Sequence, residues 1–155
     1  MIMYVVIRIR GNVRVRDKLE DTLGMLRLHR VNHAVLIPEG KQYKNMVRKV
    51  EPFITYGEIN LDMLEKMLAK RGKTETGKAL TSEFLKEIKF AGMKELAEAT
   101  ISGKTTLKKL GIKPVFRLRP PKKGHMRKGI KKNYSLGGAA GYRASDINAL
   151  VKKMI

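Results

Sequence analysis

The sequence YVVIRIR, which spans residues 4–10, decides the fold because its side chains alternate with a period of two. Such alternation is typical of a β-strand, in which successive side chains point to opposite faces of a sheet. One face carries Val5, Ile7 and Ile9, and the other carries Val6, Arg8 and Arg10. The pattern predicts a half-buried strand with one face on the core and one polar face.

The residues after this strand alternate between helical and strand patterns as far as residue 58. Asn12 is a candidate N-cap for a helix whose apolar positions fall at helical spacing, namely Val15, Leu19, Leu23 and Leu26. Short apolar strands are expected over residues 34–37 and 53–56. Between them a second helical pattern ends at Pro52 and consists of Tyr43, Met46, Val47 and Val50. Residues 1–58 therefore predict the order β-α-β-α-β.

The remainder of the chain divides into a helical segment, residues 59–113, and a basic extension, residues 114–155. Three short helices are expected in the former, from Asn60 to Gly72, after Thr81, and from Met93 to Gly103. In the latter, residues 115–119 alternate like a strand that two prolines end. A closing helix is expected after a Ser145 cap, with apolar positions Ile147, Leu150, Val151 and Met154.

The composition limits both the compartment and the kind of partner. The chain has 155 residues, enough for one domain with an appendage, and 43% of them are hydrophobic, so it can bury a core. It carries 34 Lys and Arg against 14 Asp and Glu, a net charge of +20, which favours a polyanionic partner. Cysteine is absent, which excludes disulfides and thiolate metal sites and favours a reducing cytosol. No apolar run is long enough for a membrane span, and we expect no signal peptide.

The positive charge is concentrated in the last third of the sequence. Residues 1–58 carry a net charge of +5, residues 59–100 carry +1, and residues 101–155 carry +14. Asp146 is the only carboxylate side chain after Glu98. A solvated surface usually mixes both signs, because a one-sign patch repels itself. The segregation therefore indicates a binding surface in the C-terminal third.

Motifs that would indicate catalysis or a cofactor are incomplete. The stretch SGKT at residues 102–105 ends like a P-loop, but Glu98 stands where the first glycine is required. The glycine-rich residues 137–141 lack the dinucleotide-binding spacing. His29 and His33 are spaced like a helical metal pair, but no carboxylate nearby completes a ligand set. We expect no catalytic residues, cofactor, metal or small-molecule substrate.

The basic residues suit phosphate binding, which releases counterions and gives affinity without sequence specificity. A folded RNA presents phosphates and 2′-hydroxyls over a wide surface and fits such a pattern. We expect Arg8 and Arg10 to project from the sheet face opposite the core. The candidate RNA-binding residues are Arg8, Arg10, Arg117, Arg119, Lys122, Lys123, His125, Arg127, Lys128, Lys131 and Lys132.

Two questions about aromatic side chains bear on the same surface. Tyr134 and Tyr142 can either stack on bases or anchor the small core, and the sequence leaves both roles open. A sheet that reads single-stranded RNA carries paired aromatic residues on central strands. Because Arg8 and Arg10 occupy the outward positions here, we do not expect such reading.

Several stretches resemble a known family. Residues 22–33 (TLGMLRLHRVNH), 46–50 (MVRKV) and 56–59 (YGEI) resemble the large-subunit ribosomal protein L-thirty family. Residues 116–124 (FRLRPPKKG) and 127–131 (RKGIK) are similar to its eukaryotic L-seven relatives, so the resemblance covers nearly the whole chain. Bacterial members contain little more than the first segment, and eukaryotic members begin with a basic helical arm that this sequence lacks. The archaeal form is the expected match.

The resemblance implies a mixed α/β (α+β) fold, partly ferredoxin-like, with a three-stranded sheet and helices on one face. It implies a structural role in the archaeal 50S subunit of the cytoplasmic ribosome, with 23S-type rRNA, 5S rRNA and other 50S proteins as candidate partners. One departure is Arg27, where bacterial relatives usually have glycine. A left-handed arginine costs about 1 kcal/mol, so a different turn is expected there.

The sequence thus favours a non-enzymatic rRNA-binding component of the large ribosomal subunit, part of a ribonucleoprotein that acts in translation. The alternative is a general nucleic-acid-binding or RNA-processing factor. A DNA-compacting or membrane-surface protein is also driven by positive charge, and competition between folded rRNA, duplex DNA and anionic vesicles separates these classes.

Overall fold

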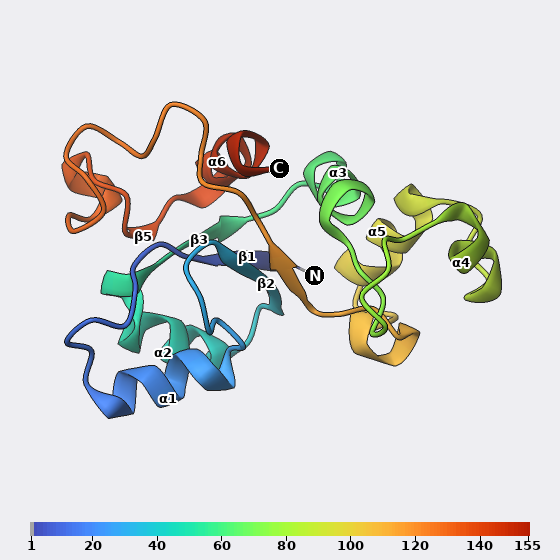
Figure 1. Ribbon diagram of the computed structural model, residues 1–155, viewed down its shortest axis with the longest axis horizontal. Helices are drawn as coiled ribbons and strands as arrows, with labels where there is room; N and C mark the ends of the chain where they lie inside the picture. The colour runs from blue at the N-terminus through green and yellow to red at the C-terminus, as the bar shows by residue number, and fades with distance from the viewer. Residues whose placement is uncertain (1) are drawn as a thin grey trace.

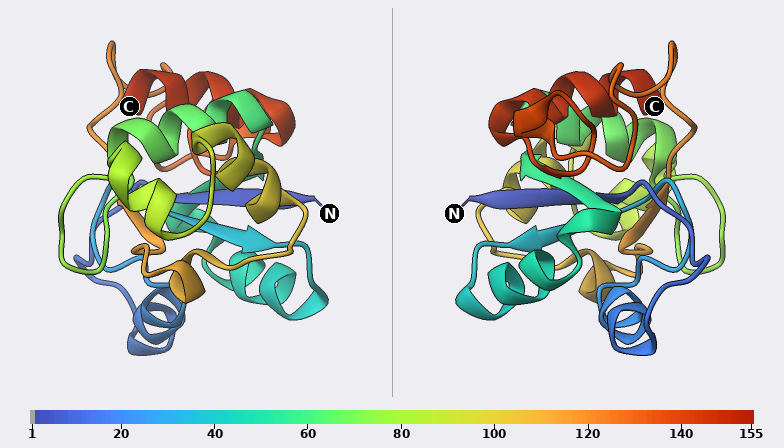
Figure 2. Two further views of the ribbon diagram at one scale, coloured as in Figure 1. Left: turned by 90° about the vertical axis from the view of Figure 1, so that its right-hand side faces the viewer. Right: turned by 90° about the vertical axis from the view of Figure 1, so that its left-hand side faces the viewer.

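A computed structural model describes residues 2–155 of the protein as one sheet between two layers of helices (Figures 1 and 2). The five strands are β1 (Met3–Arg8), β2 (His33–Pro38), β3 (Ile54–Glu58), β4 (Val115–Arg117) and β5 (Gly141–Tyr142). The six α-helices are α1 (Asp17–Met25), α2 (Lys41–Lys49), α3 (Leu61–Arg71), α4 (Ser82–Glu87), α5 (Met93–Ile101) and α6 (Ile147–Met154). None of these helices is long and apolar enough to cross a membrane.

The predicted β-α-β-α-β order and mixed α/β class are confirmed, but the sheet has five strands rather than three. The strand order is β4-β2-β1-β3-β5. β1 pairs antiparallel with both β2 and β3, and β4 pairs antiparallel with β2. β5 pairs parallel with β3, with Thr55 opposite Gly141 and Tyr56 opposite Tyr142. Both outer strands therefore come from the basic extension.

Both faces of β1 are buried, so the expectation of one polar face is wrong, whereas the two helices of residues 1–58, α1 and α2, lie on one face of the sheet as expected. Val5 and Ile7 belong to a core with α3, α5 and α6, whereas Val6 packs with apolar residues of α1 and α2. Figure 2 shows the two helical layers on opposite sides of the sheet. The second layer comes from residues after β3, and it covers the face that residues 1–58 alone leave open.

The first helix begins later than expected, and Asn12 does not cap it. α1 starts at Asp17, and its N-cap position is Arg16, which makes no capping hydrogen bond through its side chain. The Asn12 side chain instead accepts a hydrogen bond from Arg8 and donates one to Glu20. Asn12 thus links β1 to α1 across the loop that separates them.

The turn after α1 keeps Arg27 in the left-handed conformation, with φ at 59°. Its N–H bonds to the Gly24 carbonyl at 2.8 Å, and the Leu28 N–H bonds to the Leu23 carbonyl at 2.8 Å. These bonds close the helix in the manner that usually employs glycine. The turn is therefore formed despite the side chain, and the strain of a left-handed arginine remains in the folded protein.

Replacing Arg27 by glycine is expected to raise the free energy of unfolding by about 0.5–1 kcal/mol. Glycine adopts a positive φ without steric cost, and the larger entropy of the unfolded glycine variant offsets part of the gain. Arg30→Gly is the matched control, because Arg30 is exposed and is not among the positive-φ residues. In urea unfolding, Arg27→Gly should be more stable than the parent and Arg30→Gly should be less stable. The reverse order would show that Arg27 is not strained.

β3 passes very close to the turn before α6. A Cβ atom built on Gly57 would lie 2.2 Å from the Ala144 carbonyl oxygen and 2.9 Å from Cγ2 of Ile147. Asn148 reinforces this approach, because its Nδ2 donates to the Glu58 carbonyl at 2.9 Å and its Oδ1 accepts from the Asn60 N–H at 3.0 Å. The contact fixes α6 against the sheet.

Candidate nucleic-acid interface

The basic segment, defined here as residues 117–132, runs from β4 past the C-terminal end of α6 toward β5 (Figure 1). The Arg119 N–H donates to the Met154 carbonyl at 2.9 Å, and the Lys122 N–H donates to the Lys153 carbonyl at 3.1 Å. The last carbonyls of a helix have no partner within the helix itself. The segment therefore caps α6 with its backbone and leaves the side chains of Arg119 and Lys122 exposed.

The far end of the segment is packed against the start of the chain. Ile9, Ala139 and Ala140 form a small buried cluster on which Ile130 packs. The Ala140 N–H donates to the Lys132 carbonyl at 3.1 Å, which joins this cluster to the end of the segment. A Cβ atom on Gly138 would lie 2.0 Å from the same carbonyl, so glycine permits the close approach.

Arg143 is the buried cation that holds this region to the sheet. Its Nε donates to Oγ1 of Thr55 at 2.8 Å, and its Nη2 donates to the Ala139 carbonyl at 3.0 Å. Its guanidinium carbon lies 4.5 Å from the centre of the Tyr134 ring, within the range of a cation–π contact. Burial lowers the pKa of Arg143 from its ordinary value. Arg143 is thus an anchor, a role that the sequence analysis missed.

Tyr134 and Tyr142 differ in what their rings are free to contact. The Tyr134 hydroxyl donates to Asp146 at 2.6 Å, which raises the pKa of Tyr134, and Arg143 occupies one face of its ring. Anchorage therefore accounts for Tyr134. Tyr142 donates to Glu58 at 3.0 Å, and its side chain remains 44% exposed.

The cations of the basic segment are exposed and have no carboxylate partner. Within the described residues one ion pair forms, between Lys44 Nζ and Glu39 Oε1 at 2.5 Å, and it lies outside the segment. The exposed predicted residues are Arg117, Arg119, Lys122, Lys123, Arg127, Lys128, Lys131 and Lys132. Unpaired cations at this density favour a polyanion as the missing partner.

Arg8 does not project to solvent, so the predicted orientation of this residue is wrong. Its side chain is 1% exposed, and its three nitrogens donate to the Arg10 carbonyl, the Leu28 carbonyl and Oδ1 of Asn12. Burial lowers the pKa of Arg8, and the nearby charge of Glu20 acts in the opposite direction. Arg8 ties β1 to the loops around α1, and its burial leaves it inaccessible to a phosphate.

Arg10 and His125 are half-buried and differ in what they leave accessible. The Arg10 guanidinium lies 4.8 Å above the Phe53 ring, and it donates to the Pro52 carbonyl at 3.3 Å. His125 lies within the basic segment, and burial, followed by the charge of Arg143, lowers its pKa. Its Nδ1 atom is buried without a hydrogen-bond partner among residues 2–155. Both side chains are therefore less accessible to RNA than the eight exposed cations.

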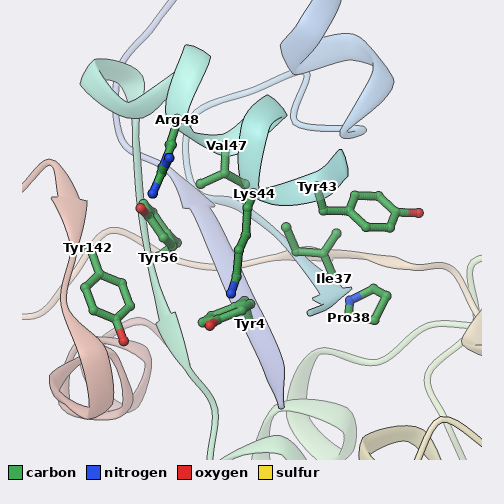
Figure 3. A pocket seen from close by; sticks show the side chains of 9 residues that line it. All are labelled: Tyr4, Ile37, Pro38, Tyr43, Lys44, Val47, Arg48, Tyr56 and Tyr142. Carbon is green, nitrogen blue, oxygen red and sulfur yellow. The ribbon is translucent and has the colours of Figure 1, made fainter. Parts of the chain in front are cut away.

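The sheet also carries a row of tyrosines that the sequence analysis did not expect. Tyr4 of β1, Tyr56 of β3 and Tyr142 of β5 lie on neighbouring strands beside α2 (Figure 3). The Tyr4 and Tyr56 ring centres are 6.5 Å apart, and those of Tyr56 and Tyr142 are 5.3 Å apart. The expectation that the strands lack paired aromatic residues is therefore wrong.

Comparisons with known proteins agree with the resemblance seen in the sequence. The family model described as ribosomal protein L30p/L7e matches residues 4–54. A protein of Methanococcus maripaludis named large ribosomal subunit protein uL30 is 50% identical, over 98% of this chain and 99% of its own. Proteins of the same name from Nanoarchaeum equitans and Methanothrix thermoacetophila are 48% and 46% identical, over 100% and 98% of this chain and 100% and 99% of their own lengths. The chain belongs to the ribosomal protein L30p/L7e family.

Membership in the L30p/L7e family confirms the predicted family and its archaeal form. The family model begins at the second residue of β1, covers α1, β2 and α2, and ends at the first residue of β3. The basic segment lies beyond that match, but the similarity to the archaeal relatives extends over it. The similarity to the archaeal relatives thus spans both the L30p/L7e core and the basic segment.

Proposed function

We propose that this L30p/L7e protein is a non-enzymatic structural component of the large ribosomal subunit, in the cytoplasmic ribosome, and binds folded rRNA. The observation that carries the proposal is the set of exposed, unpaired cations along the basic segment, which the backbone anchors at both ends. The archaeal relatives carry the name of a large-subunit protein, which supports the assignment to that particle.

Within this proposal the three segments of the chain have separate roles. Residues 1–58 form the folded anchor, residues 59–113 pack against it, and residues 114–155 bind RNA. The contacts are assigned to Arg10, to the eight exposed cations of the basic segment and to His125 at its margin. Arg8 is omitted because it is buried and three of its five N–H groups bond to the protein itself.

The RNA is proposed to be 23S-type rRNA, with 5S rRNA as the second candidate and other large-subunit proteins as neighbours. Helical RNA displays phosphates and 2′-hydroxyls rather than readable base edges in its deep groove. Lysines bind such phosphates as point charges, and arginines add planar, two-pronged contacts. A segment with both residue types suits recognition of RNA shape rather than of a short sequence.

Salt dependence tests the proposal directly. If six to eight phosphates are neutralised, the logarithm of affinity for a folded rRNA fragment should fall against the logarithm of salt with a slope of roughly −4 to −7. Filter binding from about 50 to about 200 mM salt measures this slope. A flat response would contradict phosphate binding by the basic segment.

Competition and sedimentation address the remaining classes of function. Folded rRNA should displace a labelled rRNA fragment at lower concentration than duplex DNA or anionic vesicles do. In extract the protein should sediment with 50S particles and crosslink to their rRNA. If purified particles lacked the protein, or if incubation with RNA and common cofactors changed the mass of the RNA, a binding or processing factor would replace the ribosomal assignment.

A further inference from the structure

The tyrosine row, defined as Tyr4, Tyr56 and Tyr142, lies beside α2 on the face of the sheet that packs against α1 and α2. Tyr56 stands directly opposite Tyr142 in the parallel β3–β5 pair, and Tyr4 lies on β1 two residues from Val6, the residue opposite Tyr56. The rings of Tyr4 and Tyr56 meet edge to face at 75°, and those of Tyr56 and Tyr142 are tilted by 44°. Three strands therefore bring three aromatic side chains to one place.

The row borders a hollow that is large enough for a planar ring. Its volume is about 180 Å³, and its lining also includes Ile37, Pro38 and Val47. An engineered apolar cavity of roughly 150 Å³ accepts a benzene molecule. An aromatic heterocycle the size of a nucleobase thus fits beside the tyrosines.

Two cations of α2 stand over the same hollow (Figure 3). Lys44 and Arg48 are one helical turn apart, and α2 carries no acidic residue between Lys41 and Lys49. The Lys44 ammonium is held by Glu39, whereas the Arg48 side chain has no hydrogen-bond or ion-pair partner within residues 2–155. Arg48 is thus free to meet a phosphate next to the rings.

The Tyr142 hydroxyl is hydrogen-bonded to Glu58, which fixes this ring without covering it. Burial raises the pKa of Tyr56 and of Tyr142, and the hydrogen bond from Tyr142 to Glu58 adds to the second shift. A neutral phenol stacks without repelling a phosphate. The exposed part of Tyr142 leaves its ring accessible from solvent.

We propose that the tyrosine row binds an unstacked nucleotide of single-stranded RNA, with the base stacking on Tyr142 and Tyr56 and the phosphate on Arg48. Proteins usually bind single-stranded nucleic acid with aromatic side chains beside a cationic groove. A proline-rich peptide also docks on aromatic residues, but it carries no negative charge to pair with Arg48. The two nearby carboxylates, Glu39 and Glu58, already bond to Lys44 and Tyr142. The inference rests on the proposed function and adds a second RNA contact, on the α2 side of the sheet.

An unstructured hexaribonucleotide containing 2-aminopurine tests the site, because stacking quenches the fluorescence of this base. Tyr142→Leu should weaken its binding about 5- to 100-fold, the loss expected for one stacked base, and should abolish the quenching. Tyr142→Phe should retain both signals. Phe90→Leu is the matched control, since it also removes an aromatic ring but Phe90 packs against the core on the other face of the sheet and does not line the hollow.

Arg48→Gln provides a second variant that leaves the rings in place. It should weaken hexanucleotide binding and reduce the magnitude of its salt slope by about 0.7, the value for one phosphate on a single strand. Equal binding by the parent, Tyr142→Leu and Arg48→Gln would overturn the site.

A folded rRNA fragment, measured in parallel, separates failure of the site from failure of the proposed function. If the parent binds the fragment but not the hexanucleotide, or binds the hexanucleotide without quenching, the tyrosine row is not a nucleotide site and the basic segment still stands. If the parent binds neither RNA, both proposals fail. Preference for a proline-rich peptide over the hexanucleotide would assign the row to a protein partner and overturn it as an RNA site.

Discussion

Replacing Arg117, Arg119, Lys122 and Lys123 together by alanine is expected to weaken binding to a folded rRNA fragment by roughly 30-fold or more. Each lost contact to a phosphate at an exposed position contributes a modest amount, and four of them multiply. The salt slope should become shallower by about 3 to 4, because fewer counterions are released. The melting temperature should stay nearly unchanged, since these side chains make no hydrogen bond or ion pair within residues 2–155.

A matched variant distinguishes the effect of where the positive charge lies from the effect of the total net charge on rRNA affinity. Replacing the exposed Lys66, Lys70, Lys86 and Lys94 by alanine also lowers the net charge from +20 to +16. These lysines belong to the helical segment, so rRNA binding and its salt slope should change little. An equal loss in both variants would mean that overall charge, rather than the basic segment, determines affinity.

Replacing Gly57 by alanine is expected to lower the free energy of unfolding by about 3 kcal/mol or more. The added Cβ would overlap the Ala144 carbonyl oxygen, and the Ile147 side chain blocks the other direction. Overpacking of this kind forces backbone shifts, and here the obstacle is itself backbone. Since domains of this size are stable by about 5–15 kcal/mol, the variant should unfold at a clearly lower urea concentration.

Gly11→Ala is the control for this prediction, because nothing lies within 4 Å of a Cβ at Gly11 and the residue is exposed. Its stability should stay within about 0.5 kcal/mol of the parent. If Gly57→Ala unfolded at the same urea concentration as Gly11→Ala, the close approach of β3 to the turn before α6 would be incorrect.

Local patterns in the sequence predict most of the elements, because each depends on neighbours along the chain. α3 begins after Asn60 and ends before Gly72, at the expected positions, although the Asn60 side chain makes no capping hydrogen bond. β4 covers the first part of the alternating residues 115–119, and its Phe116 is buried while Arg117 is exposed, which agrees with a period of two. The exposure of the cations in the basic segment likewise follows from its scarcity of apolar residues.

The features that the sequence did not predict depend on contacts between distant segments. Arg8 resembles an outward residue of a half-buried strand until the loops around α1 close over it. β5 has two residues, too few to show a period, and Thr55 bonds to Gly141 at a separation of 86 residues. Tyr4 and Tyr56 become partners of Tyr142 only through that pairing. Recognising the row from sequence would require knowing the strand order beforehand.

The origin of the two outer strands has a consequence for the nascent chain. β1, β2 and β3 leave the site of synthesis first, and until residues 115–142 follow, both margins of their sheet present unpaired backbone groups. Exposed edge strands can pair with another copy of the chain, and β4 and β5 cover these edges when they dock. We therefore expect a polypeptide that ends before β4 to aggregate more readily than the full chain. The C-terminal third thus shields the edges of the sheet, an effect that does not depend on its charge.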